Sequence, residues 1–443
     1  MNALMGILLF LQSQDEFEKL KREVEESRRK QEELEKRVDS LQKEQKESKS
    51  LLDEIVSQRR EKEQEAETIF DEGFWFVGKD DRLRIGGSGQ LDGRFFLEEE
   101  DGDSNFLIRR ARLFGTGVLE EKWGYMVMGR WDQQTPNLHF AWLESLHLPC
   151  ARFRVGLFKE PFSMEGLHSD QYWDFAERSL GVANFLQLED IGAMLYGKLW
   201  EDRIEYGAGV FNGRGRSTEN NPDKEYAGRL VLAPFHKGIN LLDNLYLGVS
   251  ASTSGQEETL GGTGFQTGAG TRFWTWSSGP AAAVNDDRVR WGADLEWLYG
   301  PAAIRAEYIH VDWGQVTRGT VKEEFTGSGW FVEGACVLSG ENKRRNRPVF
   351  PAQNFDPAKG TWGAWEAVAR YEEFTLEKDV LQAGLATGTD KAKGYTIGVN
   401  HYPNKHMAVK IQLQHLRFDD DITVGSHRTN DEVVLFVRFQ FEF

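Results

Sequence analysis

Arginine is the residue whose type and spacing say most about the chemistry of this chain. Several arginines stand in runs where apolar and polar residues alternate, as in Val289-Arg-Trp-Gly-Ala-Asp-Leu-Glu-Trp-Leu-Tyr299. A strand places successive side chains on opposite faces, so the arginines of such runs share the polar face. Guanidinium groups stay charged and offer forked donors to carboxylate and phosphate oxygens. The pattern predicts a polar face that favours anions electrostatically.

Strand alternation assigns the following basic residues to the polar face: Arg110, Arg112, Arg130, Arg152, Arg154, Arg229, Arg290, Arg305, Arg370, Lys410 and Arg438. Fewer acidic residues share this orientation: Asp132, Asp294, Glu296, Glu307, Glu366, Glu372 and Glu442. The face therefore has a basic excess, although the whole chain has a formal net charge of -17. The alternative for any one arginine is that it pairs with an acidic neighbour and braces the sheet.

Other kinds of chemistry find no support in the sequence. The nine histidines are scattered without metal-ligand spacing, and no nucleophile stands at motif spacing from a base. The run Gly86-Gly-Ser-Gly89 is not followed by a helix, so it does not predict a phosphate-binding loop. The acidic net charge and the lack of a dominant basic patch argue against nucleic-acid binding. We predict no enzyme activity, no cofactor and no metal.

Short amphipathic strands are the elements that would position these arginines. The clearest is the last, where Leu435, Val437, Phe439, Phe441 and Phe443 alternate with polar residues from Arg438 onward. The chain is rich in Gly (46), Phe (29) and Trp (14), which suits many strands joined by turns. No run approaches the roughly 18–20 apolar residues of a membrane-spanning helix. A β-sandwich would also alternate, but Trp and Tyr on the apolar face favour the interfacial girdles of a membrane barrel.

We predict an all-β transmembrane barrel of about 16 antiparallel strands over residues 69–443, because an even number suits a bacterial barrel. The predicted strands are 83–97, 106–119, 123–132, 138–148, 151–158, 190–200, 203–211, 225–233, 244–253, 287–299, 301–313, 328–339, 361–375, 392–402, 406–418 and 430–443.

The first 68 residues differ in composition from the rest. Residues 1–14 are a candidate signal peptide because Ala3–Leu11 is apolar, although no basic residue precedes it, and a mis-assigned start codon is the alternative. Residues 15–68 are highly charged and contain no Gly, Pro, Trp or Tyr. Heptad spacing holds for the apolar residues Phe17, Leu20, Val24, Leu34, Val38, Leu41, Leu52 and Ile55. This spacing predicts an α-helical coiled coil, with a single solvated helix as the alternative.

The two cysteines, Cys150 and Cys336, lie far apart and form no CxxC motif. Buried or lipid-facing thiols are expected, and a disulfide is the alternative. The redox compartment cannot be read from them.

The chain from about Leu83 to Phe443 resembles the phosphate-selective porin O and P family of Gram-negative outer membranes. The resemblance is carried by several short motifs and the aromatic C-terminus: Gln90-Leu-Asp-Gly-Arg94, Arg109-Arg-Ala-Arg-Leu113, Arg154-Val-Gly-Leu-Phe-Lys-Glu-Pro-Phe162, Glu177-Arg-Ser-Leu180, Gly209-Val-Phe-Asn-Gly213, Gly363-Ala-Trp-Glu-Ala367 and Ala369-Arg-Tyr371. It implies a trimeric barrel that conducts anions past an inward-folded third loop. It also implies that Arg109, Arg110 and Arg229 belong to an arginine ladder, although strict alternation would point Arg109 outward unless the strand has a bulge or ends there.

The stretch Lys159–Glu189, between the fifth and sixth predicted strands, is the candidate third loop, because loops of this length in compact domains are usually functional. Lys159 and Arg178 are its best pore-facing cations. Four acidic residues nearby could neutralise them: Asp170, Asp174, Glu177 and Asp190.

One segment departs from the family pattern associated with phosphate selectivity, and one basic cluster stands apart from the strands. Well-known members of the family have an arginine-rich segment between strands nine and ten, whereas residues 263–276 contain only Arg272. The cluster Lys343-Arg344-Arg345-Asn-Arg347 lies in a loop that could attract anions at the pore mouth or face lipopolysaccharide.

The sequence thus predicts an outer-membrane diffusion channel for small anions, with phosphate or pyrophosphate as candidate solutes. The predicted pore residues are Arg109, Arg110, Arg112, Arg130, Arg154, Lys159, Arg178, Arg229, Arg272, Arg290 and Arg370. Expected partners are membrane lipid, lipopolysaccharide, small anions and further copies in a homotrimer. The alternatives are a structural protein whose periplasmic coiled coil tethers the outer membrane to the cell wall, and a soluble β-rich binding protein.

Overall fold

The computed structural model describes residues 73–443 apart from short gaps at 99–101, 133–134, 217–221, 238–239, 261 and 279–281. It also describes the backbone of residues 67–70 and helical residues between 19 and 50, with gaps. The chain divides into two compact units, Met1–Glu67 and Thr68–Phe443. Each is described by itself below.

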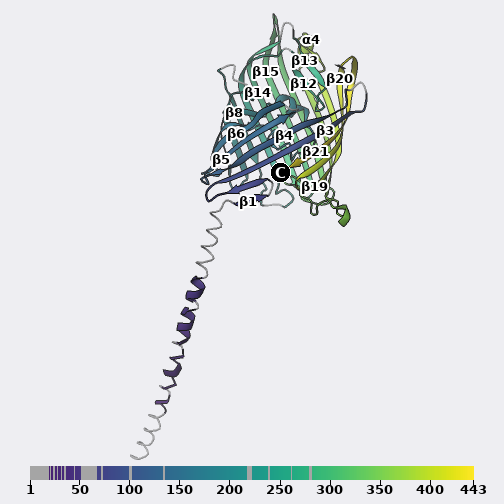
Figure 1. Ribbon diagram of the computed structural model, residues 1–443. Coiled ribbons are helices and arrows are strands. Elements are labelled where there is room, and N and C mark those ends of the chain that lie inside the picture. Colours follow the sequence, from purple (N-terminus) through teal and green to yellow (C-terminus); the bar gives the residue numbers. More distant parts are fainter. Residues whose placement is uncertain are drawn as a thin grey trace, which may run out of the picture. The chain divides into compact units, whose positions relative to one another are not determined.

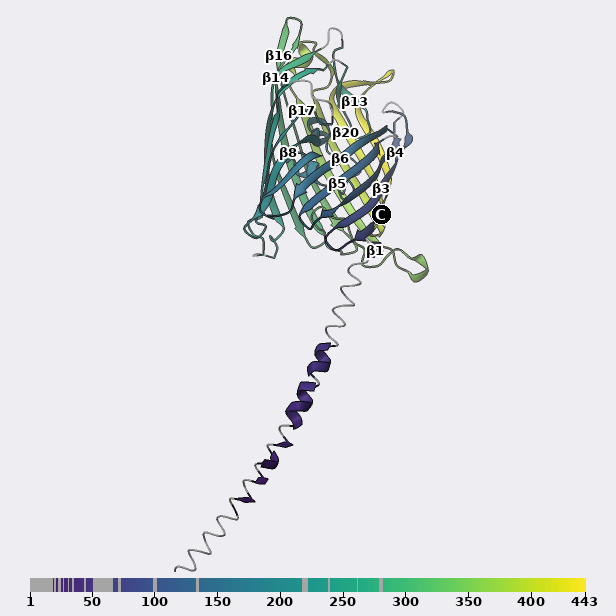
Figure 2. The ribbon, with the colours of Figure 1, turned by 60° about the vertical axis from the view of Figure 1, so that its left-hand side comes forward.

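The second unit is a closed barrel of sixteen antiparallel strands (Figures 1 and 2), which confirms the predicted architecture. Each strand pairs with the next along the chain, and the last strand closes the barrel by pairing with the first, for example through Arg438 opposite Asp92. The strands are β3 (Arg82–Phe96), β4 (Asn105–Leu119), β5 (Trp123–Asp132), β6 (Thr135–Ser145), β7 (Arg152–Lys159), β8 (Glu189–Leu199), β9 (Ile204–Phe211), β10 (Glu225–Leu232), β11 (Leu245–Thr259), β14 (Ala283–Tyr299), β15 (Ala302–Arg318), β16 (Val321–Val337), β17 (Ala364–Leu376), β19 (Lys391–Asn404), β20 (Met407–Val424) and β21 (His427–Glu442).

The barrel has two ends. We call the end where β3 begins and β21 finishes the terminal end, and the other the far end, where Figure 1 shows α4 (Asp379–Gln382) and β13. Short strands that the sequence did not predict are β1 (Glu67–Phe70), β2 (Phe74–Val77), β12 (Gly264–Gln266), β13 (Arg272–Trp276) and β18 (Ala386–Gly388). The last three form a small separate sheet.

All sixteen predicted barrel strands are present, but five extend further at the far end. β11, β14, β15, β16 and β20 gain several residues there, and β11 continues its pairing with β14 as far as Thr259 opposite Ala283. These extensions have polar residues at successive positions in the sequence, as in Ser254-Gly-Gln-Glu-Glu-Thr259. Alternation therefore could not reveal them.

Alternation along the barrel wall is as expected. Trp291 and Phe439 are about half exposed on the outside, at 47% and 54%, whereas Arg290 and Arg438 point inward and are fully buried. At the terminal end of the barrel, several exposed aromatic side chains lie within two residues of the end of their strand: Trp123, Phe153, Tyr299, Trp365 and Phe441. Such a ring is typical of an interfacial girdle. Cys150 and Cys336 are exposed free thiols.

Much of the barrel interior is filled by protein. Residues 160–188, which we call the inner loop, fold into the barrel and contain α2 (Met164–Leu167) and α3 (Leu180–Phe185). Gly181 of α3 lies directly against Gly329 of β16, where an added Cβ would approach the facing Cα to 3.2 Å. Toward the far end, α3, β12 and β13 form an apolar core with the wall, in which Phe273 and Trp274 are fully buried. Two cavities remain beside the inner loop and this core, on the side of the barrel formed by β4–β10.

The described part of the first unit is helical. Exposed ion pairs join Glu26 to Lys30 and Arg28 to Glu32, each four residues apart. A single chain does not show whether helices associate, so the coiled coil stays a prediction. Residues 1–14, the candidate signal peptide, lie outside the described residues. Among the described residues, no helix is long and apolar enough to span a bilayer.

Candidate functional site: two cavities and the inner loop

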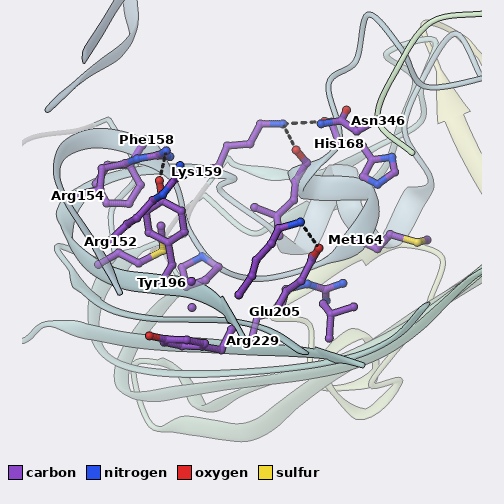
Figure 3. Close-up of a pocket in the computed structure, with 18 of the residues that line it drawn as sticks. Arg152, Arg154, Phe158, Lys159, Met164, His168, Tyr196, Glu205, Arg229 and Asn346 are labelled. Atoms are coloured by element: carbon purple, nitrogen blue, oxygen red, sulfur yellow. Dashed lines mark hydrogen bonds and ion pairs between the residues drawn. The ribbon is translucent and has the colours of Figure 1, made fainter. Parts of the chain in front are cut away.

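Two cavities lie between the inner loop and the barrel wall. The terminal-end cavity, of about 850 Å³, is lined by β5–β10, by residues 161–168 and by Arg345 and Asn346. Figure 3 shows Arg152, Arg154 and Tyr196 grouped on one side of it, with Met164 and His168 on the other. The far-end cavity, of about 960 Å³, is lined by β3–β5, by the second half of the inner loop and by residues 266–270.

Lys159 and Arg178 stand between the cavities. Lys159 ends β7 and lines the terminal-end cavity, whereas Arg178 belongs to the inner loop and lines the far-end cavity. The carbonyl oxygen of His168 accepts hydrogen bonds from both, at 2.7 Å from Lys159 Nζ and 3.3 Å from Arg178. Lys159 also donates to the carbonyl of Leu167 at 3.2 Å, and Arg178 donates to that of Glu165. Among the described residues, no carboxylate lies within the 4.0 Å ion-pair distance of either cation.

The acidic residues that the sequence offered as neutralising partners are held by other groups. Asp170 pairs with Arg110 and Arg112, and Glu177 with Arg109, Arg94 and Arg438. Asp174 pairs with Arg305 and Lys343. Asp190 accepts hydrogen bonds from the backbone of Ile191 and Gly213. None of these four carboxylates therefore forms an ion pair with Lys159 or Arg178.

Arg109 points inward because β4 contains a bulge. Gln90 faces Arg110 and Leu91 faces Ile108, so Arg109 is the extra residue on its strand. Its guanidinium makes a two-point contact with Glu177, at 2.8 and 3.0 Å. The structure thus supplies the bulge that the assignment of Arg109 required.

Arg110 and Arg112 are both bound to Asp170 of the inner loop. Arg112 makes a two-point contact at 2.6 and 2.7 Å, and Arg110 Nε lies 2.8 Å from the same carboxylate. Burial would raise the pKa of Asp170, but Arg112 and then Arg110 hold it well below its usual range. The pKa of Glu177 is also held well below its usual range, because Arg109 and Arg438 outweigh the effect of burial. Both carboxylates are therefore ionised and bind the loop to the wall.

Arg130 also lines the far-end cavity, at the end of β5. It contacts the side chains of Asn137 at 2.9 Å and His139 at 3.2 Å, and its distance to Asp132 is 3.4 Å. Its charge is compensated less closely than those of Arg109 and Arg112.

Arg154 and Arg229 line the terminal-end cavity and are both paired. Arg154 contacts Glu144 at 2.6 Å, and its guanidinium lies over Trp142, with 4.2 Å to the ring centroid. Arg229 makes a two-point contact with Asp294, at 2.5 and 2.8 Å.

Arg290 and Arg370 are at the barrel interior but do not line either cavity. Arg290 lies beneath the start of the inner loop and pairs with Glu160 and Glu225. Arg370 lies beneath its middle, 3.1 Å from Glu333 and 3.4 Å from Glu165. Both were predicted as pore residues. The inner loop covers them, and this follows from long-range packing that alternation does not encode.

Arg272 is also not among the residues that line the two cavities. It begins β13 in the small far-end sheet, is exposed, and donates to the carbonyl of Gly262 at 3.1 Å. The interval between β11 and β14 packs its aromatic residues into the apolar core and leaves this arginine at the surface.

The wall holds the inner loop through its backbone. Glu307 of β15 accepts hydrogen bonds from the N–H groups of Met164 and Glu165 at the start of α2, at 3.1 and 2.9 Å. Glu372 of β17 accepts one from Leu180 at the start of α3, at 2.6 Å. Carboxylates suit helix N-termini, where N–H groups lack partners and the dipole is positive. The inward-facing acidic residues thus hold the loop.

A second loop, residues 338–363, joins β16 to β17 at the terminal end and was missed as an inner element. Lys343 is buried between Asp174 and Glu366, at 2.5 and 2.6 Å. Arg345 pairs with Glu205 and Glu296, at 2.8 and 3.0 Å. Asn346 accepts a hydrogen bond from the backbone of Ser169, at 2.8 Å. The basic cluster was predicted to attract anions at a mouth or to face lipopolysaccharide, but these members of it fold inward.

Comparison with known proteins agrees with this geometry. A family model described as phosphate-selective porin O and P matches residues 83–443. Porin O of Pseudomonas aeruginosa is 24% identical over 384 residues, which cover 80% of this chain and 85% of that protein. Among solved structures, OmpT of Vibrio cholerae has a TM-score of 0.53 at 10% identity and covers 85% of this chain and 100% of its own. The anion-selective porin from Comamonas acidovorans has a TM-score of 0.52 at 13% identity, with 82% and 100% covered. At such identities these structures show the barrel fold alone. The family match extends over most of the chain, so the protein belongs to the phosphate-selective porin O and P family and is an outer-membrane porin channel.

Proposed function

We propose that this channel prefers anions and conducts them between the two cavities past Lys159 and Arg178. The observation that carries the proposal is the position of these two cations. They share one carbonyl oxygen and have no carboxylate within ion-pair distance among the described residues. Two like charges so close together repel, and an anion that arrives between them relieves the repulsion.

The other predicted pore cations would play a secondary part. Arg109, Arg110, Arg112 and Arg130 on the far-end side are compensated by carboxylates to different degrees, as are Arg154 and Arg229 on the terminal-end side. Paired charges fix the wall and the inner loop, while the low-dielectric surroundings focus the field of the unpaired ones. The names of two similar proteins, Porin O and an anion-selective porin, support a preference of this sign.

Phosphate and pyrophosphate are the candidate solutes. Their oxygens suit the forked donors of Arg178 and the three N–H donors of Lys159. Support for phosphate is weaker than support for anions in general, because Arg272 is turned away from the cavities.

Reversal potentials in a potassium chloride gradient across a lipid bilayer test the proposal. The wild-type channel should pass chloride in preference to potassium, with phosphate blocking the chloride current. Lys159→Gln and Arg178→Gln should each lower the chloride-to-potassium permeability ratio by at least about threefold, because each removes a positive charge that, among the described residues, has no carboxylate within ion-pair distance.

Lys198→Gln is the matched control. Lys198 also lines the terminal-end cavity, but it lies at the rim, is more than half exposed and pairs with Glu205 at 2.9 Å. Its loss should leave the permeability ratio nearly unchanged. A cation-preferring wild-type current would refute the proposal.

We further propose that residues 15–68 form a periplasmic coiled coil that fastens three copies together. Val38 and Leu41, three residues apart on one helix face, are 50% and 57% exposed in the single chain, as partner-facing residues would be. A trimer form of OmpT is a fold-level precedent. Deleting residues 15–68 should abolish trimers on native gels. Intact trimers with altered spacing between outer membrane and cell wall would instead favour a tether.

A further inference from the structure

The two cavities differ in character, which a simple path for small inorganic ions does not require. Charged and amide side chains dominate the far-end cavity, including Arg109, Arg112, Asp170 and Gln187. The terminal-end cavity has a large apolar surface beside its basic residues. Its apolar side chains include Met126, Trp142, Phe158, Met164, Met194 and Val231.

The apolar side chains lie on both sides of the terminal-end cavity. Met126, Trp142 and Met194 come from three strands of the wall, whereas Met164 comes from α2 of the inner loop. Figure 3 shows Met164 on the side opposite Phe158 and Tyr196. Methionine side chains are flexible and polarizable, so they adapt to apolar guests of different shape. A planar apolar group that enters the cavity could therefore contact side chains on both of its faces.

Basic residues lie at several places around this cavity, and Lys159 is the one that contacts the backbone of the inner loop. Lys159 stands beside His168 at the inner limit of the cavity, next to Arg178. Arg154 offers no open face, because its guanidinium lies over Trp142 at 4.2 Å and over Tyr196 at 4.9 Å, and its edge binds Glu144. The cavity thus combines apolar walls with a lysine that, among the described residues, has no carboxylate within ion-pair distance.

We propose, as an extension of the proposed anion preference, that the terminal-end cavity binds amphiphilic organic anions. Its occupant would carry one anionic head group and one compact apolar part, such as an aromatic ring. The head group binds at Lys159 and Arg178, and the apolar part lies between Met126, Met194 and Met164. The volume of about 850 Å³ is in the range of small-molecule sites, which are concave, mostly apolar and oriented by a few polar groups. Inorganic phosphate gains nothing from the apolar walls, whereas a phenyl group leaves water on binding.

Block of the chloride current by phenyl phosphate and by inorganic phosphate tests the inference. The two blockers share their head group, so their difference reports the apolar part. In the wild-type channel, phenyl phosphate should half-block the current at a concentration about tenfold lower than inorganic phosphate. Met126→Gln and Met194→Gln keep the length of the side chain and make it polar, and each should reduce this ratio several-fold.

Gln187→Met is the matched control, because it makes the opposite change in the far-end cavity and should leave the blocker ratio unchanged. Equal half-blocking concentrations in the wild-type channel would overturn the inference while leaving anion preference intact. A wild-type ratio that neither methionine variant alters would also overturn it. Failure of the proposed function would be seen separately, as a cation-preferring reversal potential without any blocker.

Discussion

The space beneath the inner loop and the cavity beside it give a positive charge different surroundings. On the side of β14–β21, Arg290, Arg370 and Arg438 are buried beneath the inner loop, and each contacts two carboxylates or more. On the side of β4–β10, Lys159 stands at the edge of a cavity and donates hydrogen bonds to two carbonyl oxygens, and no carboxylate of the described residues lies within ion-pair distance. A positive charge is therefore a fixed brace at these three arginines and available to solutes at Lys159.

The comparison shows that burial and pairing decide the role of a pore arginine. A buried charge is tolerated only where partners compensate for its lost hydration. The side that holds the inner loop supplies those partners from both the wall and the loop. The opposite side keeps the two cavities, where a cation can be hydrated and does not need a carboxylate.

The largest effect is expected from removing a brace. Arg290→Met should lower the free energy of unfolding by about 3–5 kcal/mol, because Glu160 would be left buried without its cation. Arg288 would still hold Glu225, at 2.6 Å. Urea unfolding in lipid, followed by tryptophan fluorescence, measures the loss. The double variant Arg290→Met with Glu160→Gln should recover more than half of it. A loss below about 1 kcal/mol for the single variant would show that Arg290 is not a brace.

An intermediate effect is expected from Glu177→Gln, which separates bracing from selectivity. Glu177 compensates Arg109 next to the far-end cavity, so its neutralisation should raise the chloride-to-potassium permeability ratio about twofold. The free energy of unfolding should fall by about 1–3 kcal/mol, because charged hydrogen bonds are weakened. Reversal potentials and urea unfolding measure the two quantities.

Glu333→Gln is the control for that prediction. Glu333 pairs with Arg370 and Arg305 under the inner loop, at 3.1 and 3.4 Å. A similar loss of stability is expected, with no change in the permeability ratio. If both variants shift selectivity equally, the division of the barrel into two sides is wrong.

Alternation predicted the wall of the barrel well because it is a local property. The residues next to Arg290 and Arg438 in the sequence are apolar, so alternation predicts that both arginines face the barrel interior. Both are buried there in the structure. The inward turn of Arg109 could be reached only by assuming a bulge, since nothing in the spacing marks one.

Packing inside the barrel could not be read from the strands. Val434 and Phe436 break the apolar pattern of β21, and they are buried against Ala176 of the inner loop. Phe273 and Trp274 fill an interior core, although outward aromatic residues were expected to form girdles. Phe273, for example, packs against Phe374 and Phe418, both more than a hundred positions away, and no period in the sequence relates them. Lys343 illustrates the same limit, because its partner Asp174 lies 169 positions away.

A smaller effect is expected at the start of the inner loop. Ser163 precedes α2, and its Oγ accepts a hydrogen bond from Gly166 at 2.8 Å. Ser163→Ala should reduce the free energy of unfolding by about 1 kcal/mol, the usual value for a lost helix cap. The loss should not be larger, because Glu307 still accepts from the other N–H groups. Asp356→Ala, which removes a cap from an exposed turn, should have less effect in the same urea measurement.

The smallest effect is expected at Arg272, which the sequence placed among the pore residues. Its side chain is exposed and makes one hydrogen bond to a backbone carbonyl, so Arg272→Gln should change the free energy of unfolding by less than about 0.5 kcal/mol. The chloride-to-potassium permeability ratio should equal that of the wild type, in contrast to Lys159→Gln. Because both substitutions remove one positive charge from the same chain, the difference between them isolates position from net charge. An equal drop in the permeability ratio for both variants would mean that the net charge of the chain sets the selectivity, and not the positions of Lys159 and Arg178 between the cavities.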